Sequence, residues 1–458
     1  MKRGGRRASS LLALPYHWAP PQSPLNLIAL ILAVGVPAAL LGLALHFYLG
    51  VDALRALSFW ADERTLAGLI SDRMPGNAPV LTGVHLFGDF ALPYYWVSLP
   101  DPWSSDPQMV VDYLPPVLLI FSGLSAFGSG SALVLYLVGM TVCLLVPCWW
   151  ALAGQPLAVR IIGTTVIGLL TGPALASLDR GNTQGFLPLL LFGFAVGVLS
   201  RRWWLASLCL IGAVTMKVVP ILLIVVLLAR RQWWWAGVTI LLTGVISLGT
   251  MPLVTDDPMG ALPALVRNML GFGVVQTTYE TFMSYNVSML GGLAQAAVGI
   301  GLPGLSVVVW EHAGSIGALY FVAVLPLLLS NRLELWIRLV LAFACLTAVV
   351  PIAYPYALNW TIAAAAVIFL MSQGGRGVEP MHGAVSKYLV TVVVLLVGLL
   401  AVPYPIFIPG SEAAGHPASI LGLANAALML AVPAALYVWL LRAHLVPVAG
   451  MQRTGPRT

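Results

Sequence analysis

Long apolar runs recur along this chain of 458 residues, and short polar segments separate them. The first run is about as long as the roughly 20 residues that a helix needs to cross a bilayer. Backbone polar groups in hydrocarbon must be satisfied internally, so such runs fold as helices. The runs are Leu25–Leu49, Ser131–Leu152, Ile161–Leu178, Gly185–Leu199, Leu205–Met216, Val218–Ala229, Ala236–Leu253, Ser315–Leu329, Leu339–Ile352, Leu358–Met371, Tyr388–Val402 and Ser419–Leu441. They predict an all-α polytopic membrane protein.

Composition excludes a soluble globular protein, because only 8% of the residues are charged and 60% are hydrophobic. Soluble domains carry about 25% charged residues. The net charge of +6 does not indicate nucleic-acid binding, since no basic patch interleaved with aromatic residues is present. No cluster of His, Asp and Glu has metal-ligand spacing, so we expect no metal or other cofactor. The four cysteines lie in apolar runs and are predicted to be free buried thiols: Cys143, Cys148, Cys209 and Cys345.

The amino-terminal segment is basic and precedes the first apolar run, a pattern shared with signal peptides. A signal peptide has an apolar region of roughly 7–15 residues, whereas Leu25–Leu49 is longer. We interpret it as an uncleaved first span. Trp pairs and the Trp233–Trp235 triplet beside later runs are typical of interfacial anchors.

Basic residues favour one orientation, because they concentrate in cytoplasmic segments of membrane proteins. With the amino terminus inside, six of the 22 basic residues fall outside: Arg55, Arg64, Arg73, Arg180, Lys217 and Arg267. The other 16, which is 22 minus 6, fall inside: Lys2, Arg3, Arg6, Arg7, Arg160, Arg201, Arg202, Arg230, Arg231, Arg332, Arg338, Arg376, Lys387, Arg442, Arg453 and Arg457. Both termini are then cytoplasmic, with about 11 to 13 membrane helices.

The pair of runs around Lys217 has two interpretations. If Arg201-Arg202 and Arg230-Arg231 are both cytoplasmic, the runs form a hairpin of two short helices with Lys217 at its tip. Otherwise they form one long span with a buried lysine. The domain organisation is a basic cytoplasmic segment (1–24), one integrated transmembrane domain (25–441) and a cytoplasmic tail (442–458). The expected setting is the plasma (inner) membrane of a bacterium.

Carboxylates gather in the first external loop, residues 51–130, above all between Val51 and Tyr113. Within it, Ala53–Ile70 has an apolar face interleaved with charges, and Tyr113–Phe127 is apolar but contains Pro115-Pro116. We predict that both lie as helices in the membrane interface. Ionisable groups at membrane depth are costly, so Asp179-Arg180 and Lys217, directly beside apolar runs, are functional candidates.

A resemblance to a known family rests on several of these segments. Arg180-Gly181-Asn182-Thr183-Gln184, the block Gly212–Pro220 with Lys217, and the later Arg230-Arg231 resemble glycosyltransferase family 87, the polyprenol-phosphate-mannose-dependent mannosyltransferases of the GT-C fold. Asp89 with Tyr94-Tyr95, then Tyr113-Leu114-Pro115-Pro116, is similar to that family's first-loop aspartate and Tyr-Pro-Pro segment. Asn286-Val287-Ser288 is similar to its Asn-x-Ser loop.

Three departures from the family pattern stand out. The amides of the Gly-Gln-x-Asn turn are exchanged, since this chain has Asn182 and Gln184. The stretch before Asp89 is longer, which leaves Asp52 as an alternative catalytic position. The late segment reads Tyr354-Pro355-Tyr356 and lacks the family's His.

The resemblance implies transfer of a hexose from a polyprenyl-phosphate donor to a hydroxyl of a glycan or glycolipid on the non-cytoplasmic face. Mannose is the leading candidate for the hexose, and the configuration at its anomeric carbon is expected to invert. Asp89, or alternatively Asp52, is the expected base, because a hydroxyl attacks only as its proton leaves. Charge builds on the departing phosphate, so cations and hydrogen-bond donors are expected beside it. The candidates for donor phosphate and substrate binding are Arg180, Lys217, Arg267, His312, Asn182, Gln184, Tyr94, Tyr95, Tyr113 and Asn286.

Three other functions remain open from the sequence. The sugar could be arabinofuranose instead of mannose. The chain could be a lipid or glycan transporter (flippase), although transporters typically carry charges near the bilayer midplane and related halves. It could also be a non-catalytic assembly factor, in which Asp89 would tolerate replacement.

Overall fold

The structure is a computed structural model that describes residues 24–48, 87–104, 111–277, 286–372 and 420–445. Within these ranges the chain is helical and has no strand. The helices are α1 (Pro24–Tyr48), α4 (Gly88–Trp96), α5 (Pro115–Ser125), α6 (Ser129–Ala151), α7 (Leu157–Gly168), α8 (Gly172–Arg180), η1 (Thr183–Phe186), α9 (Leu187–Leu199), α10 (Trp203–Met216), η2 (Val219–Leu223), α11 (Ile224–Ala229), α12 (Trp233–Thr250), η3 (Met251–Leu253), α13 (Pro258–Thr277), α15 (Met289–Gly299), α16 (Pro303–Glu311), α17 (Ala313–Leu329), α18 (Leu335–Ala348), η4 (Pro355–Asn359), α19 (Trp360–Ser372) and α21 (Ile420–Leu445). The all-α prediction is confirmed for these residues.

Four helical segments are long and apolar enough to cross a membrane, or six if each of two bent helix pairs counts as one span, among the residues that the structure describes. They are Ser129–Ala151, Trp233–Leu253, Pro355–Ser372 and Gly422–Leu441. The bent pairs are α7 with α8, at 62°, and α16 with α17, at 75°. Several predicted spans are instead apolar helices of 10–17 residues, so this criterion finds fewer spans than predicted.

The helix break at Lys217 supports the hairpin interpretation of the two short runs. α10 ends at Met216, and Lys217 is extended, with φ −150° and ψ 137°. Because the next turn is the separate helix η2, one continuous helix through Lys217 is excluded.

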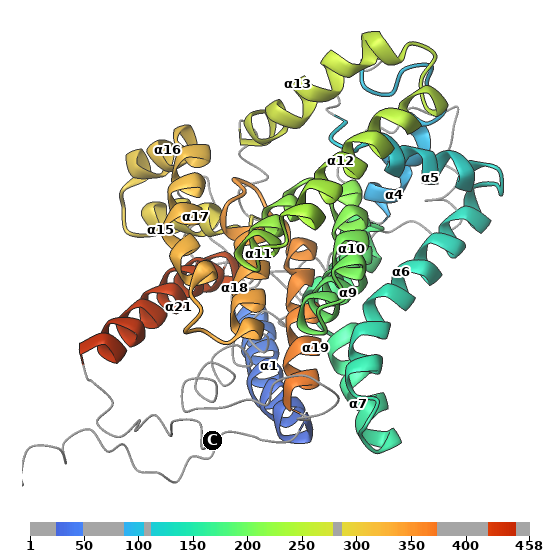
Figure 1. The fold of residues 1–458 in the computed structure, drawn as a ribbon. Helices are drawn as coiled ribbons and strands as arrows, with labels where there is room; N and C mark the ends of the chain where they lie inside the picture. The colour runs from blue at the N-terminus through green and yellow to red at the C-terminus, as the bar shows by residue number, and fades with distance from the viewer. Residues whose placement is uncertain (1–23, 49–86, 105–110, 278–285, 373–419, 446–458) are drawn as a thin grey trace, which may run out of the picture.

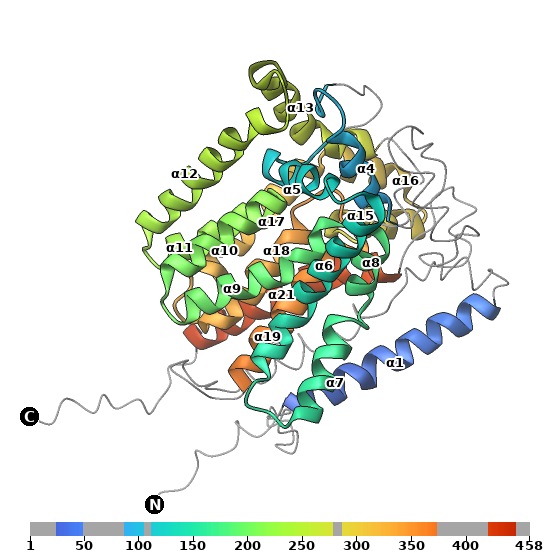
Figure 2. The same ribbon diagram turned by 90° about the vertical axis from the view of Figure 1, so that its right-hand side faces the viewer.

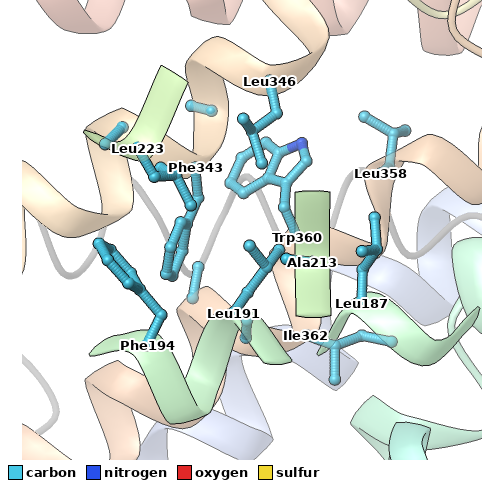
Figure 3. Packing of buried hydrophobic residues seen from close by; sticks show 14 of the residues in the cluster. Leu187, Leu191, Phe194, Ala213, Leu223, Phe343, Leu346, Leu358, Trp360 and Ile362 are labelled. Carbon is cyan, nitrogen blue, oxygen red and sulfur yellow. The ribbon is translucent and has the colours of Figure 1, made fainter. Parts of the chain in front are cut away.

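The core of the bundle lies where α9, α18 and α19 pack together (Figure 1 and Figure 2). Phe194 from α9, Phe343 from α18 and Trp360 from α19 are buried and lie close together (Figure 3). All residues of α18 from Trp336 to Ala348 are buried. This packing fixes the ends of α8, α10 and η4, which carry the polar residues described below.

Several predicted features lie outside the described residues. These are the basic amino-terminal segment, Asp52, the interfacial helix predicted for Ala53–Ile70, the span Tyr388–Val402 and the tail after residue 445. The second predicted interfacial segment forms α5, an apolar helix of 11 residues that begins at the two prolines. That length is too short to cross a bilayer, as predicted.

Candidate functional site

Helix α4 positions Asp89 in its first turn, at the positive end of the helix dipole. The helix begins after Phe87, which has a left-handed backbone with φ 52°. The Phe87 amide donates a 2.7 Å hydrogen bond to the Asp179 carbonyl oxygen and joins α4 to α8. Phe90 is buried against Phe121 of α5 and Tyr136 of α6. Asp89 therefore stands on a helix that is anchored on two sides.

Helix α8 ends at Gly181, and this glycine allows the close approach of α4. Gly181 has φ +63°, and a Cβ there would lie 2.8 Å from the Phe90 Cβ. Only glycine combines a left-handed backbone with such a contact at no steric cost. Arg180 occupies the last helical turn, and Asn182 follows as the N-cap of η1.

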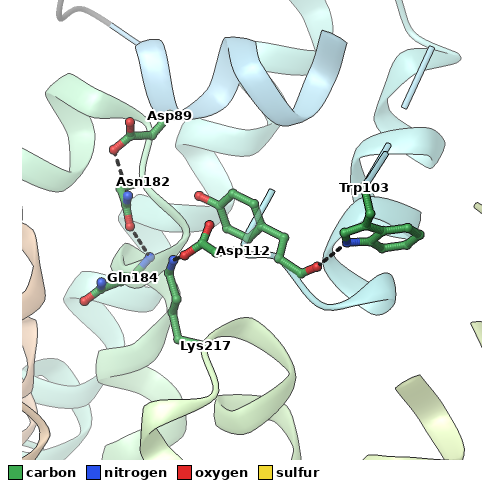
Figure 4. Close-up of polar contacts among 7 residues, drawn as sticks. Asp89, Trp103, Asp112, Asn182, Gln184 and Lys217 are labelled. Carbon is green, nitrogen blue, oxygen red and sulfur yellow. Dashed lines mark hydrogen bonds and ion pairs between the residues drawn. The ribbon is translucent and has the colours of Figure 1, made fainter. Parts of the chain in front are cut away.

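The Asp89 carboxylate is held by two donors, one to each oxygen. Arg180 Nη2 lies 3.0 Å from Oδ1, and Asn182 Nδ2 donates to Oδ2 at 2.7 Å. Asn182 in turn accepts a 2.9 Å hydrogen bond from the Gln184 amide, so its side-chain orientation is fixed (Figure 4). A carboxylate oxygen has two lone pairs, and each oxygen of Asp89 keeps acceptor capacity for a ligand.

A second ion pair joins two segments that are 105 residues apart. Lys217 Nζ lies 2.8 Å from Asp112 Oδ2 and 4.6 Å from the centre of the Tyr113 ring. Trp103 Nε1 donates to the Tyr113 carbonyl oxygen at 3.1 Å and fixes this stretch (Figure 4). The side chains of both ion pairs are partly exposed, between 13% and 24%. A ligand from outside can therefore reach them.

Two tyrosines connect the ion pairs electrostatically. Burial raises the pKa of Tyr113 well above its ordinary value, and the charges of Asp112 and Asp89 raise it further. Burial also raises the pKa of Tyr354, on which Arg180, Asp89 and Asp112 all act. Both phenols thus stay neutral near pH 7 and can donate hydrogen bonds to an incoming anion or hydroxyl.

Among the described residues, buried acceptor atoms without a hydrogen bond occur on Asp179, which precedes Arg180, and on Asn359. Both carboxylate oxygens of Asp179 and Oδ1 of Asn359 are buried and accept no hydrogen bond in the described part of the chain. Asn359 Nδ2 donates to Ser177 Oγ at 2.6 Å and to the Gln184 carbonyl at 3.2 Å, which ties η4 to α8 and η1. Buried polar atoms in native proteins are almost always paired, so these acceptors need a donor that water, a proton or a ligand supplies.

The structure brings six of the predicted site residues into one cluster: Asp89, Arg180, Asn182, Gln184, Lys217 and Tyr113. Tyr94 and Tyr95 share α4 with Asp89. Tyr94 is buried 5.5 Å from the Phe90 ring, whereas Tyr95 is partly exposed. These two residues shape the helix that carries Asp89.

Asn286 joins two loops through its side-chain hydrogen bonds. Its side chain donates to the Pro351 carbonyl at 2.9 Å and accepts from the amides of Ser288 and Ala353 at 2.9 and 3.0 Å. Asn286 is 1% exposed, and these bonds join the loop before α15 to the loop before η4. The site proposed below does not include it.

Arg267 and His312 are not drawn into the cluster. Arg267 is exposed on α13, and His312 is exposed at the junction of α16 and α17. Figure 1 shows α16 and α17 on the opposite side of the molecule from α4. Asp52 lies outside the described residues, so its position relative to Asp89 is not given.

Two site residues were missed in the sequence, Asp112 and Asn359, whereas Asp179 was already a functional candidate. Asp112 directly precedes Tyr113, and Asn359 follows the Tyr354-Pro355-Tyr356 segment, so both were adjacent to residues already selected. Their pairing with Lys217 and Ser177 could not be read from the chain, because 105 and 182 residues separate the partners.

Among the residues that the structure describes, no group of three or more His, Cys, Asp or Glu side chains is arranged to hold a metal ion. The four cysteines are free. No family model and no curated protein matches this chain.

Proposed function

We propose that this chain is a membrane glycosyltransferase that acts on the non-cytoplasmic face, with the cluster around Asp89 as its active site. The sugar is a hexose, mannose first, carried on a polyprenyl phosphate, and the acceptor is a hydroxyl of a glycan or glycolipid. The observation that carries the proposal is the convergence of a partly exposed carboxylate with two cations, Arg180 and Lys217, at the ends of helices in an apolar bundle.

Asp89 suits the role of general base because its position is fixed and its acceptor capacity is not exhausted. Arg180 and Asn182 hold both oxygens from one side. The acceptor hydroxyl would donate to one oxygen and pass its proton there as its oxygen attacks the anomeric carbon. The bond from that carbon to the phosphate oxygen breaks in the same displacement, so the configuration inverts.

Arg180 and Lys217 suit the departing phosphate. Both are charged donors, and charge-assisted hydrogen bonds to phosphate strengthen as its negative charge grows. In the free protein each is held by a carboxylate, Asp89 or Asp112. A phosphate oxygen can share these donors without a large movement of either side chain.

The buried acceptors of Asp179 and Asn359 support a polyhydroxylated substrate nearby. Sugar hydroxyls are donors, and an acceptor left unpaired in a buried site costs about 1–3 kcal/mol. Because both side chains are fully buried, they suit the ordering of bound sugar or water better than proton transfer.

The decisive experiment is a transfer assay with the full chain in lipid vesicles and radiolabelled polyprenyl-phosphate-mannose. Asp89→Asn keeps the shape of the side chain but replaces one acceptor oxygen with an NH2 donor, so it removes the base together with one of the two contacts to Arg180 and Asn182. Turnover should fall about 10²- to 10⁴-fold. The matched control is Asp256→Asn, an exposed acid near the start of α13, which should keep full activity.

Outcomes of this assay discriminate among the alternatives. Full activity of Asp89→Asn with loss in Asp52→Asn would move the base to Asp52. Turnover with an arabinofuranose donor only would change the sugar class. Retained turnover in both variants would overturn the assignment of a base in this loop.

The transporter remains a second candidate because of one observation, the two bent helix pairs. Broken helices line substrate sites in transporters, and the α7–α8 pair carries Asp179 and Arg180 at its end. Movement of a lipid-linked sugar across the vesicle without any transfer would favour this function.

A further inference from the structure

Arg338 is a charged side chain inside a helix that is otherwise apolar and buried. It lies in the first turns of α18, is 4% exposed, and every residue from Trp336 onward in this helix is buried as well. A buried guanidinium is costly unless an anion or several acceptors surround it. An anion or several acceptors should therefore lie beside the Arg338 guanidinium.

The described residues supply no anion to Arg338. Its Nε makes no hydrogen bond, and no ion pair to its guanidinium forms in the parts of the chain that the structure describes. Glu334, one turn earlier, accepts a 2.5 Å hydrogen bond from Trp336 Nε1. The backbone amide of Arg338 donates to the Glu334 carbonyl oxygen at 3.2 Å.

A second cation lies nearby on another helix. Arg230 caps the carboxyl end of α11, which packs against α18, and its charge acts on Arg338. Arg230 is partly exposed, so a ligand can approach it from outside the bundle, whereas Arg338 is buried behind it. Two arginines approach each other from two helices, and the described residues supply no counter-ion. Their combined positive charge attracts an anion to this place.

We propose that Arg338 and Arg230 form a binding site for a phosphate group, separate from the cluster around Asp89. A guanidinium matches phosphate oxygens in a bidentate geometry. Ile337, the residue before Arg338 in the chain, lines a small apolar cavity with Val340 and Leu341 of α18 and residues of α17, α19 and α21. Because the helices around the two arginines are apolar, the phosphate is that of an anionic phospholipid, and free phosphate is the other source of the same chemistry.

The site of Arg230 and Arg338 lies at the other end of the hairpin from Lys217 and the Asp89 cluster. Arg230 follows the two short helices that start after Lys217, a run of 11 residues (Val219–Ala229), or about 17 Å at 1.5 Å per residue. The charge distribution predicts that Arg230 and Arg338 lie towards the cytoplasm, where basic pockets between helices bind anionic headgroups. The inference stands whether or not the chain transfers sugars.

The test is a titration of the full chain in phosphatidylcholine vesicles with phosphatidylglycerol, read as the thermal unfolding midpoint. Wild type should gain stability as the anionic lipid rises. Arg338→Gln should need about tenfold more anionic lipid for the same gain, the effect expected for one lost charge-assisted contact. The matched control is Arg332→Gln, an exposed arginine on the loop before α18, which should respond like wild type.

Further arms keep the result interpretable. Inorganic phosphate in pure phosphatidylcholine identifies a free-phosphate site if it reproduces the gain in wild type but not in Arg338→Gln. Should Arg338→Gln fail to fold, Arg230→Gln at the exposed helix end serves as the second variant and should show the same loss. An equal response of Arg338→Gln, Arg230→Gln and wild type would overturn the proposal, as would an equal loss in Arg332→Gln.

Discussion

Tyr113 is the residue on which the two ion pairs of the candidate site converge. Its ring lies under Lys217, its carbonyl accepts from Trp103, and the carboxylates of Asp112 and Asp89 both act on its hydroxyl. Burial is the largest cause of its raised pKa. A neutral phenol at this point can donate to a phosphate or sugar oxygen over the whole physiological pH range.

The raised pKa of Tyr113 gives a prediction for pH. The ionised phenol is disfavoured in the folded state, so the stability that the neutral form contributes is fully present below pH 10.0, the ordinary value, and is lost as pH rises through the higher folded pKa. In wild type the tyrosinate absorbance of Tyr113 should appear only well above pH 10. The difference titration against Tyr113→Phe measures this residue. A difference spectrum that titrates at the ordinary value would contradict the buried placement.

At the scale of the elements, close packing depends on small residues at helix crossings. Gly197 of α9 faces α10 so closely that a Cβ would lie 2.5 Å from the Ala206 backbone nitrogen. Small residues at such contacts let helix backbones approach in membranes, where van der Waals packing replaces the hydrophobic effect. Helix α10 leads directly to Lys217, so this crossing helps to place the second ion pair.

Gly197→Ala should therefore destabilise the protein by about 1–3 kcal/mol, the usual cost of overpacking. Its effect can be measured as the free energy of unfolding in mixed detergent. Gly237→Ala is the matched control, because Gly237 is exposed on α12 and a Cβ there meets nothing within 4 Å. Alanine at Gly237 should be neutral or stabilising by up to about 1 kcal/mol. Equal stability of the two variants would mean that α9 and α10 do not pack as closely as described.

The breaks between elements explain what could be predicted and what could not. Hydropathy located α6, α12 and α21 to within a few residues, because apolar length is the property that the bilayer selects. It missed the bend after Gly168 in the run Ile161–Leu178, where Thr171-Gly172-Pro173 starts a new helix. A Gly-Pro step inside an apolar run is a break signal that the apolar average conceals.

The site was predicted in part for a similar reason. Arg180 and Lys217 stood out as charges beside apolar runs, Asp89 stood out through the family resemblance, and each is part of an ion pair. Which carboxylate meets which cation depends on how the helices pack, and local sequence carries no information on that. Arg267 and His312 were selected by charge type alone, and both are exposed and are not part of either ion pair.

At the scale of the whole molecule, the two polar regions have opposite predicted sidedness. The Asp89 cluster belongs to segments predicted to be external, whereas Arg230, Arg332 and Arg338 belong to segments predicted to be cytoplasmic. The sidedness of each region depends on the orientation of all the spans between them. If one span ran in the opposite direction, the two regions would lie on the same side of the membrane.

Labelling of single cysteines tests the sidedness. In a variant whose four native cysteines are replaced by Ala, Asp256→Cys should react with a reagent that cannot enter the cell, because this exposed residue is predicted to be external. Arg332→Cys, equally exposed, should react only after the cells are opened. Reaction of both in intact cells, or of Arg332→Cys alone, would contradict the predicted topology.

The two ion pairs also balance one another, with two cations against two carboxylates. For the proposed reaction, an incoming phosphate meets these four groups with no surplus positive charge, so the intact donor gains little from them. When Asp89 takes the acceptor's proton, one negative charge is neutralised at the moment when another grows on the leaving phosphate. The net charge of the site is therefore the same in the bound donor and in the transition state, but negative charge has moved from Asp89 to the phosphate, where Arg180 and Lys217 can stabilise it. This gain arises in the transition state and not in the bound donor, which is the differential stabilisation that raises a rate without trapping the substrate.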